Sequence, residues 1–232
     1  MQKEIISVDY KNHKIVADIL PAHSVPQVFC MHGAGKSAGV VFDQIRQLLA
    51  ENHISSCALD FLGYGETGGN VYDSSLKMRT EQAQMIIEKA KVTKPLIVIG
   101  GSMGCYNAIK LTEIYPVKLV VLFTPAVYAK DVYEVNFSEK FTTFIREPKS
   151  WDSTDAWDIL TKYKGKILIL TGGKDQTIPS EIPEKIYNSS NHAAFREIIN
   201  FSDSPHRILK EYLNYHIEEL KMVVDKIIEL SK

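Results

Sequence analysis

The sequence is poor in cysteine. Its 232 residues include three cysteines, Cys30, Cys57 and Cys105, and none of them forms a Cys-x-x-Cys pair. Cys30 and Cys57 lie in strand-like apolar runs, where a thiol usually serves as a small core side chain. We therefore expect core residues rather than metal ligands or redox centres, in a reduced, cytoplasmic protein.

The sequence also lacks an excess of charge and a long apolar run. Its formal net charge is −1, so no overall field favours nucleic acid or anionic lipid. No apolar run approaches the roughly 20 residues that a helix needs to span a bilayer. Residues 1–7 lack the apolar stretch of a signal peptide. We expect no nucleic-acid partner and no stable membrane anchor.

Motifs for metals and nucleotides are missing or incomplete. No cluster of histidine, cysteine, aspartate and glutamate has the spacing of a metal site. The ending Gly35-Lys36-Ser37 resembles that of a phosphate-binding loop, but Cys30 stands where this motif requires its first glycine. Lys36 is therefore interpreted as a solvated loop charge. The sequence predicts neither a metal nor another cofactor.

Internal repeats, low-complexity stretches and linkers are absent, which favours a single domain over residues 1–232. Apolar strand-like runs alternate with amphipathic helical segments. Strands are expected as a hairpin within 3–20 and at 25–31, 54–60, 94–99, 117–123, 166–170 and 194–199. Helices are expected at 38–51, 74–91, 105–115, 180–189 and 207–231. This alternation predicts an α/β fold with a mostly parallel eight-stranded sheet and helices on both faces.

Residues 126–163 interrupt the alternation with aromatic, charged and irregular sequence. The segment follows a strand on the carboxyl side of the sheet, so we expect it to form a small lid insertion. Its large apolar side chains either pack the insertion onto the domain or line an apolar pocket for an acyl or alcohol group. They are Val127, Tyr128, Val132, Tyr133, Phe137, Phe141, Phe144, Ile145, Trp151 and Trp157.

The most informative motif is Gly100-Gly101-Ser102-Met103-Gly104, which joins the strand-like run 94–99 to a helical segment. A G-x-S-x-G sequence between a strand and a helix is a nucleophile elbow. The turn is so sharp that bulky side chains at the flanking positions would collide. It would lift the Ser102 hydroxyl above the sheet edge, at the positive end of a helix. Ser102 is the predicted nucleophile.

A serine nucleophile needs a base, and His206 is the predicted one. Among the seven histidines, it alone follows the last expected strand in a loop before the final helix, where it can fold over the elbow. His216 falls inside that helix. His13, His23 and His53 fall at hairpin or loop positions on the wrong edge of the sheet.

The base needs an acid that orients it, and two aspartates compete. Asp175 ends the strand-like run 166–170 in a glycine-bearing turn, two strands after the elbow. It also gives the chain order serine, acid, histidine, which is expected for a nucleophile elbow. Asp203 lies only three residues before His206, where it can simply cap a turn. We favour Asp175.

A tetrahedral intermediate carries an oxyanion, which needs preorganised N–H donors. The backbone amide of Met103 directly follows the nucleophile. The second donor is expected in the small-residue loop after the 25–31 strand, at Ala34. In the same loop, His32 is expected to bond neighbouring backbone rather than to act in catalysis. Asp60 is likewise expected to accept loop N–H groups in a structural turn.

Five segments in order, each at a strand end, give the chain a resemblance to the α/β-hydrolase superfamily. They are His32-Gly33-Ala34-Gly35, Asp60-Phe61-Leu62-Gly63-Tyr64-Gly65, Gly100-Gly101-Ser102-Met103-Gly104, Gly172-Gly173-Lys174-Asp175 and Ser204-Pro205-His206. Within the superfamily the chain resembles small serine hydrolases of the monoacylglycerol-lipase-like and serine-aminopeptidase-like groups.

This resemblance implies an α/β-hydrolase fold with Ser102 as nucleophile, Asp175 as acid and His206 as base. It implies oxyanion amides at Ala34 and Met103. The sequence departs from many relatives at two positions. Gly101 replaces a histidine before the serine, and Cys105 replaces a second glycine after the elbow.

The expected function is a cofactor-free serine hydrolase that cleaves carboxylic esters or thioesters through an acyl-enzyme on Ser102. The expected partner is a small-molecule acyl substrate, and the protein is a monomer or a homodimer. One alternative is a peptidase or amidase, in which Asp152 or Glu134 would hold a substrate amine. Another is a non-catalytic binding protein on the same fold, which an intact serine, acid and histidine set disfavours.

Overall fold

The computed structural model describes residues 2–22, 24–35 and 37–232, so His23 and Lys36 lie outside the described residues. Eight strands form one sheet in the order β1-β2-β4-β3-β5-β6-β7-β8. β1 pairs with β2, and β2 with β4, in antiparallel fashion, whereas all other pairs are parallel. The strands are β1 (Glu4–Tyr10), β2 (His13–Leu20), β3 (Val28–Met31), β4 (Ser56–Asp60), β5 (Leu96–Gly101), β6 (Val117–Phe123), β7 (Lys166–Gly172) and β8 (Phe195–Phe201). The predicted mostly parallel eight-stranded sheet is confirmed.

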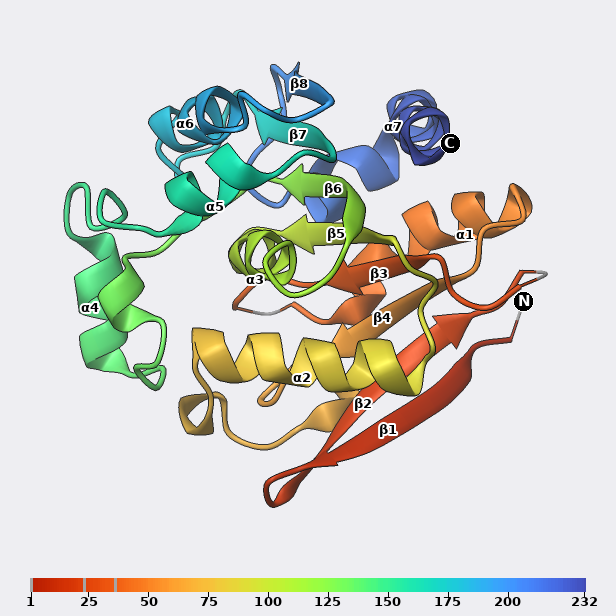
Figure 1. Ribbon diagram of the computed structural model, residues 1–232, viewed down its shortest axis with the longest axis horizontal. Coiled ribbons are helices and arrows are strands. Elements are labelled where there is room, and N and C mark those ends of the chain that lie inside the picture. Colours follow the sequence, from red (N-terminus) through yellow and green to blue (C-terminus); the bar gives the residue numbers. More distant parts are fainter. Residues whose placement is uncertain (1, 23, 36) are drawn as a thin grey trace.

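Helices cover both faces of the sheet (Figure 1). One face carries α1 and α7, and the other carries α2, α3, α5 and α6. The helices are α1 (Asp43–Glu51), α2 (Leu76–Lys89), α3 (Met103–Leu111), α4 (Glu139–Arg146), α5 (Ala156–Lys162), α6 (Glu181–Ser189) and α7 (Ile217–Ser231). Short turns of helix stand at η1 (Gly39–Phe42), η2 (Gly65–Thr67), η3 (Val71–Asp73), η4 (Lys130–Val132), η5 (Ile208–Tyr212) and η6 (Leu213–Tyr215).

The central strands are apolar on both sides because both faces are covered. In β5, Leu96 and Val98 point into the core beneath α2 and α3, while Ile97 and Ile99 point into the core beneath α1 and α7. All four side chains are buried, as the period of two along a strand requires when each face packs on helices.

The cysteines behave as predicted from their apolar surroundings. Cys30, Cys57 and Cys105 are free and fully buried. Burial raises the pKa of the Cys30 thiol to about 12, which keeps it protonated and unreactive at neutral pH. The predicted role of Cys30 and Cys57 as small core side chains is confirmed.

The last helix is shorter than predicted. The sequence predicts one helix over 207–231, but η5 is a single π-type turn, η6 follows it, and α7 begins after His216. The backbone leaves helical geometry at His216, with φ −118° and ψ 72°. The apolar stripe survives in part, because Leu213 and Leu220 are buried on either side of the break, whereas Ile217 is exposed.

The segment between β6 and β7 carries η4, α4 and α5, which we call the lid segment (residues 126–163). α5 packs against α3 and α6, so it belongs to the helical layer of the sheet. α4 projects away from the sheet at the edge of the molecule (Figure 1). Whether the lid segment opens and closes over a site stays a prediction.

In the described part of the chain, no helix is long and apolar enough to cross a membrane. Within residues 2–22, 24–35 and 37–232, no group of three or more histidine, cysteine, aspartate or glutamate side chains is arranged to hold a metal ion.

Candidate active site

Ser102 stands on a strained turn between β5 and α3. Its φ of 49° and ψ of −116° lie in a region that side-chain-bearing residues rarely adopt. A Cβ atom on Gly100 would lie 2.7 Å from the Cα of Cys105, and one on Gly104 would lie 2.2 Å from the carbonyl oxygen of Met31. Both flanking glycines are therefore required by close packing of backbone, as the motif predicts.

Gly101 differs from these flanking glycines. A Cβ atom there would meet only the Phe42 ring, at an ordinary 3.6 Å. The absence of a side chain at this position is therefore no requirement of the turn. It leaves space beside Ser102 on the face of the sheet that η1 covers.

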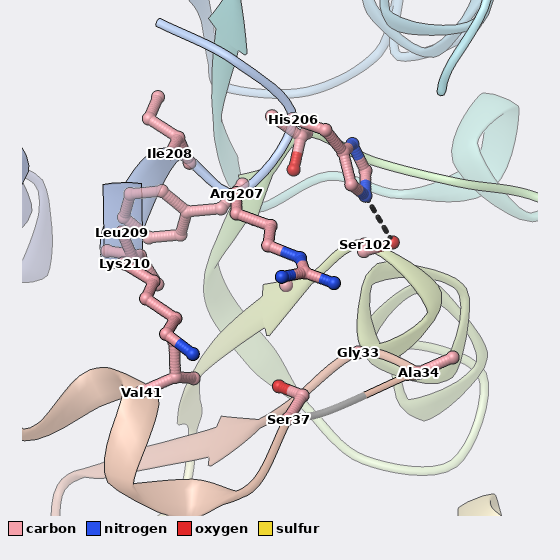
Figure 2. Close-up of a pocket in the computed structure, with 13 residues that line it drawn as sticks. Gly33, Ala34, Ser37, Val41, Ser102, His206, Arg207, Ile208, Leu209 and Lys210 are labelled. Atoms are coloured by element: carbon pink, nitrogen blue, oxygen red, sulfur yellow. Dashed lines mark hydrogen bonds between the residues drawn. The ribbon is translucent and has the colours of Figure 1, made fainter. Parts of the chain in front are cut away.

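The structure brings Ser102, His206 and Asp175 into one hydrogen-bonded row. His206 follows β8, and its Nε2 lies 3.0 Å from the Ser102 Oγ, as the dashed line in Figure 2 marks. Asp175 follows β7, and its Oδ2 lies 2.8 Å from the Nδ1 of His206. Because the carboxyl ends of β5, β7 and β8 meet at one edge of the sheet, residues separated by up to 104 positions come within hydrogen-bond distance.

The environment of Asp175 favours its ionised form. Burial alone would raise the pKa of this carboxyl. The hydrogen bond from His206 and those from the amides of Thr177 and Ile178 outweigh burial and hold the pKa below its ordinary value. Asp175 is therefore a carboxylate fixed by two backbone donors, with its second oxygen facing the imidazole.

Asp203, the rival acid, lies elsewhere. Its side chain is 68% exposed and pairs with Lys174 at 2.7 Å. The His206 Nδ1–H donates its hydrogen bond to Asp175 instead.

The loop after β3 passes directly against the serine. A Cβ atom on Gly33 would lie 3.0 Å from the Cβ of Ser102. The next residue, Ala34, and the first residue of α3, Met103, both line the cleft that contains Ser102. The two residues predicted to supply oxyanion amides thus flank the serine.

His32 has the structural role that the sequence predicts. Its Nδ1 donates to the carbonyl of Gly33 at 2.7 Å, because its Nε2 accepts from the amide of Phe61 at 3.1 Å. Burial and the nearby Arg79 charge hold the pKa of His32 well below its ordinary value. Asp60 likewise accepts backbone N–H groups, from Gly39 at 2.6 Å and Glu66 at 2.8 Å.

Two hollows open beside Ser102. The large cleft, about 1170 Å³, contains Ser102 and His206 and extends beneath the lid segment. Six of the predicted lid side chains line it: Val127, Tyr128, Phe137, Phe141, Ile145 and Trp151. All except Ile145 are also buried, so the same side chains pack the insertion onto the domain and line the cleft.

The small hollow, about 90 Å³, also opens beside Ser102 (Figure 2) and shares Ala34, His206 and Arg207 with the large cleft. Its walls come from the β3 loop, η1, β5, β6 and η5, and include Val41, Gly101, Phe123, Ile208 and Leu209. The hollow also contains Arg207 and Lys210, which our sequence analysis missed. The position of Arg207 directly after His206, the predicted base, could have indicated that Arg207 lies near the site.

Arg79 was also missed. It lies on α2, is fully buried, and places its guanidinium 3.8 Å from the centre of the Phe61 ring. Its Nη2 donates to the carbonyls of His32 and, at 3.3 Å, Gly33. Its Nη1 contacts the Sδ of Met103 at 2.9 Å. Arg79 lies among polar residues of a predicted helix, and nothing in this sequence context indicated that its side chain is buried.

Comparisons with known proteins agree with this architecture. A family model described as serine aminopeptidase, S33, matches residues 22–149. No curated protein sequence matches the chain.

Many solved structures share the fold. A thioesterase domain from a curacin biosynthetic pathway has a TM-score of 0.72 at 14% identity, covering 99% of this chain and 100% of that domain. The esterase Est1E of Butyrivibrio proteoclasticus with bound ferulic acid has a TM-score of 0.73 at 18% identity, covering 97% and 99%. The esterase Pf2001 of Pyrococcus furiosus has a TM-score of 0.72 at 20% identity, covering 98% and 92%. These structures show the fold, and the family model, which matches more than half of the chain, shows that the chain belongs to the serine aminopeptidase S33 family of α/β hydrolases.

Proposed function

We propose that the protein is a serine hydrolase that cleaves carboxylic esters or thioesters through an acyl-enzyme on Ser102. The observation that carries this proposal is the hydrogen-bonded row of Ser102, His206 and Asp175 at the mouth of a partly apolar cleft. A strained, glycine-flanked serine next to an oriented imidazole is the arrangement that activates a hydroxyl.

The first step is acylation. His206 Nε2 accepts the proton of the Ser102 hydroxyl while Oγ attacks the substrate carbonyl carbon, and a tetrahedral intermediate forms. Asp175 accepts the Nδ1–H of His206, which fixes the ring tautomer and stabilises the imidazolium that results.

The oxyanion of this intermediate needs donors that are already in place. We assign this role to the backbone amides of Ala34 and Met103, which flank Ser102. Met103 is the first residue of α3, so the positive end of the helix also faces the developing charge.

The intermediate collapses when the leaving group departs with the proton of His206. Water then enters, His206 removes its proton, and the acyl-enzyme is hydrolysed by the same steps in reverse order. The lid segment, residues 126–163, is proposed to be part of the single domain and to enclose the acyl or leaving group. Six of its apolar side chains line the cleft.

The charges of the cleft favour esters over aminopeptidase substrates. Asp152 pairs with Lys185 at 2.8 Å and Glu134 pairs with Lys77 at 2.9 Å, and neither lines the cleft. The described charged residues that do line it, besides His206, are four cationic ones and two acidic ones: Arg146, Lys149, Lys174, Arg207, Glu147 and Glu211. A substrate ammonium would meet a net positive surface. The esterases and the thioesterase domain among the similar structures support the same choice.

A fluorophosphonate probe tests the proposal directly. We expect it to label Ser102 in the folded protein, and we expect wild type but not Ser102→Ala to hydrolyse 4-nitrophenyl acetate. A folded protein that is neither labelled nor active would support the non-catalytic alternative. Release of amino acids from peptide 4-nitroanilides faster than hydrolysis of esters would favour the peptidase.

A further inference from the structure

The small hollow beside Ser102 combines apolar walls with two cationic side chains. Figure 2 shows the Arg207 guanidinium extending across the hollow toward Gly33 and Ser37, and the Lys210 ammonium beside Val41. None of the described residues that line the hollow is acidic. The small hollow therefore places two cations, and no acidic side chain among the described residues, beside Ser102.

Neither cation is neutralised strongly by the protein. Arg207 forms one ion pair, with Glu211 at 3.4 Å, and both side chains are about half exposed, at 53% and 43%. Such exposed pairs contribute at most about 1 kcal/mol. Lys210 forms no ion pair within the described residues. Both groups are therefore available to a ligand.

We infer that the substrate carries an anionic group, a carboxylate or a phosphate, that binds Arg207 and Lys210 in the small hollow. The inference rests on the proposed ester hydrolysis and names the class of ester. A guanidinium presents paired donors that match carboxylate and phosphate oxygens. Apolar walls such as Phe123 and Leu209 lower the local dielectric and strengthen this attraction.

The size of the hollow sets the length of the group. The volume of about 90 Å³ admits only a short chain, whereas the large cleft of about 1170 Å³ admits a much larger one. Part of this space exists because position 101 is a glycine, whose missing side chain would point toward the Phe42 ring. The anionic end is therefore short, and the bulkier part of the ester lies beneath the lid segment.

Pairs of esters of equal shape test this inference. Monomethyl glutarate carries the carboxylate on the acyl side, and methyl 4-carbamoylbutanoate replaces it by a neutral amide. Acetoxyacetate and acetoxyacetamide form the equivalent pair on the alcohol side, and 2-acetoxyethyl phosphate with its neutral dimethyl phosphate ester forms a pair that adds a phosphate. For each pair the measured quantity is the ratio of kcat/KM for the anionic and the neutral ester.

We expect wild type to prefer the anionic member of at least one pair about tenfold or more. Arg207→Gln should lower that ratio about tenfold and Lys210→Gln about threefold, and 0.5 M salt should lower it in wild type. Lys221→Gln, which removes an exposed lysine of α7, is the matched control and should keep the ratio.

Equal hydrolysis of both members of every pair by wild type, or a ratio that Arg207→Gln leaves unchanged, would overturn the inference but not the proposed function. Absence of all turnover together with absence of fluorophosphonate labelling would overturn both. If labelling occurs without turnover of these esters, slower labelling in the presence of glutarate than of the neutral diamide glutaramide supports the anionic subsite, and equal protection contradicts it.

A different observation carries a second inference, which concerns the buried charge of Arg79. Among the described residues, two arginines are fully buried. Arg46 contacts Asp18 at 2.5 Å and Asp43 at 3.4 Å, so its charge is compensated. Arg79 forms no ion pair in the described part of the chain, and its Nε has no hydrogen-bond partner there.

Burial of an unpaired charge is costly. Burial lowers the pKa of Arg79 to about 10, so the side chain still carries its charge at neutral pH. Its partners are backbone carbonyls of the loop that holds Ala34 and the sulfur of Met103, the two residues assigned to the oxyanion hole.

We infer that Arg79 is a positioning residue that sets the oxyanion hole. The peptide unit is planar and trans, so the N–H of Ala34 points opposite to the C=O of Gly33. That carbonyl accepts from both Arg79 and the ring of His32. Holding it toward the core aims the Ala34 N–H outward, and the buried positive charge behind the loop favours an oxyanion in front of it.

Substitution of Arg79 tests this role. We expect Arg79→Met to lower kcat about 10- to 100-fold with little change in KM, and Arg79→Lys to restore part of the loss. The affinity of an alkyl boronic acid, which forms an anionic tetrahedral adduct with serine, should fall by the same factor as kcat. Arg46→Met is the matched control, because it removes a buried arginine and should lower the melting temperature without lowering kcat of the folded enzyme.

A purely structural role predicts the opposite pattern. If folded Arg79→Met or Arg79→Lys keeps the kcat and boronic acid affinity of wild type, the inference is wrong. Since Arg79→Met can fail to fold, Arg79→Lys measured below its melting temperature decides the question.

Discussion

Backbone atoms surround Ser102 on one side, and side chains surround it on the other. Behind the serine, toward the sheet, the contacts are between backbone atoms, and the flanking glycines leave no space for a side chain. In front of it, the small hollow and the large cleft are walled by side chains from η5 and the lid segment, several of them exposed. In the proposed reaction, backbone contacts hold the geometry at the serine, whereas replaceable side chains would select the substrate.

Of all the substitutions predicted here, removal of the proposed nucleophile should lower kcat the most. We expect Ser102→Ala to lower kcat for an activated ester at least about 10⁵-fold, because no other group in the row can form the acyl-enzyme. Steady-state kinetics on 4-nitrophenyl acetate measures this, with circular dichroism to check the fold. Activity within tenfold of wild type would contradict the assignment.

The acid can be tested against its own neighbour. Asp175→Asn should lower kcat about 10³- to 10⁴-fold, because an amide opposite the Nδ1 of His206 favours the wrong ring tautomer. Asp203→Asn is the matched control and should change kcat less than twofold, since Asp203 pairs with Lys174 at the surface. Equal effects of the two substitutions on kcat would remove the distinction drawn between these aspartates.

Alanine substitutions at two glycines of the elbow, Gly104 and Gly101, should differ in their effect on stability. A methyl group on Gly104 would meet the carbonyl of Met31 at 2.2 Å, so we expect Gly104→Ala to lower the free energy of unfolding by about 3 kcal/mol or more. Gly101→Ala, which meets only the Phe42 ring at 3.6 Å, should lower it by less than about 1 kcal/mol. Urea unfolding measures both, and similar losses would contradict the backbone account.

Side chains in front of the serine should alter selectivity rather than the chemical step. Ile145 lines the large cleft from α4 and is only half-buried. We expect Ile145→Ala to lower the ratio of kcat/KM for an octanoyl over an acetyl ester by about 3- to 10-fold, because removing three carbons from an apolar wall costs about 1–3 kcal/mol at most. An unchanged ratio would place the acyl chain elsewhere.

The smallest expected effect is the pH dependence of the free energy of unfolding that arises from Asp175. The folded-state pKa of Asp175 lies below its ordinary value, so the carboxylate stabilises the fold above about pH 4, and this contribution is lost as the pH falls through the lower folded value. The difference in the free energy of unfolding between wild type and Asp175→Asn should therefore be larger at pH 7 than at pH 3. Urea unfolding at the two pH values measures it, and an equal difference would contradict the shift.

Much of the region behind the serine was predictable from local sequence. The glycines around Ser102, the order of serine, acid and histidine, and the contacts of His32 and Asp60 all follow from residue types at strand ends. Such positions are predictable because backbone geometry limits them to few residue types. The final helix was overpredicted, because its apolar stripe continues from Leu213 to Leu220 across the break at His216.

The sequence by itself determined the order of the strands and of the helices outside the lid segment, the elbow at Ser102 and the choice of residues around it, since these depend on local patterns. The helices α4 and α5 of the lid segment were not predicted. Only the tertiary structure decided that Arg207 and Lys210 share a hollow with the serine, and that Arg79 lies uncompensated behind the oxyanion loop. A charged residue looks alike in sequence whether it is solvated or buried. What surrounds it depends on which distant elements, here α2 and the loop after β3, the fold brings together.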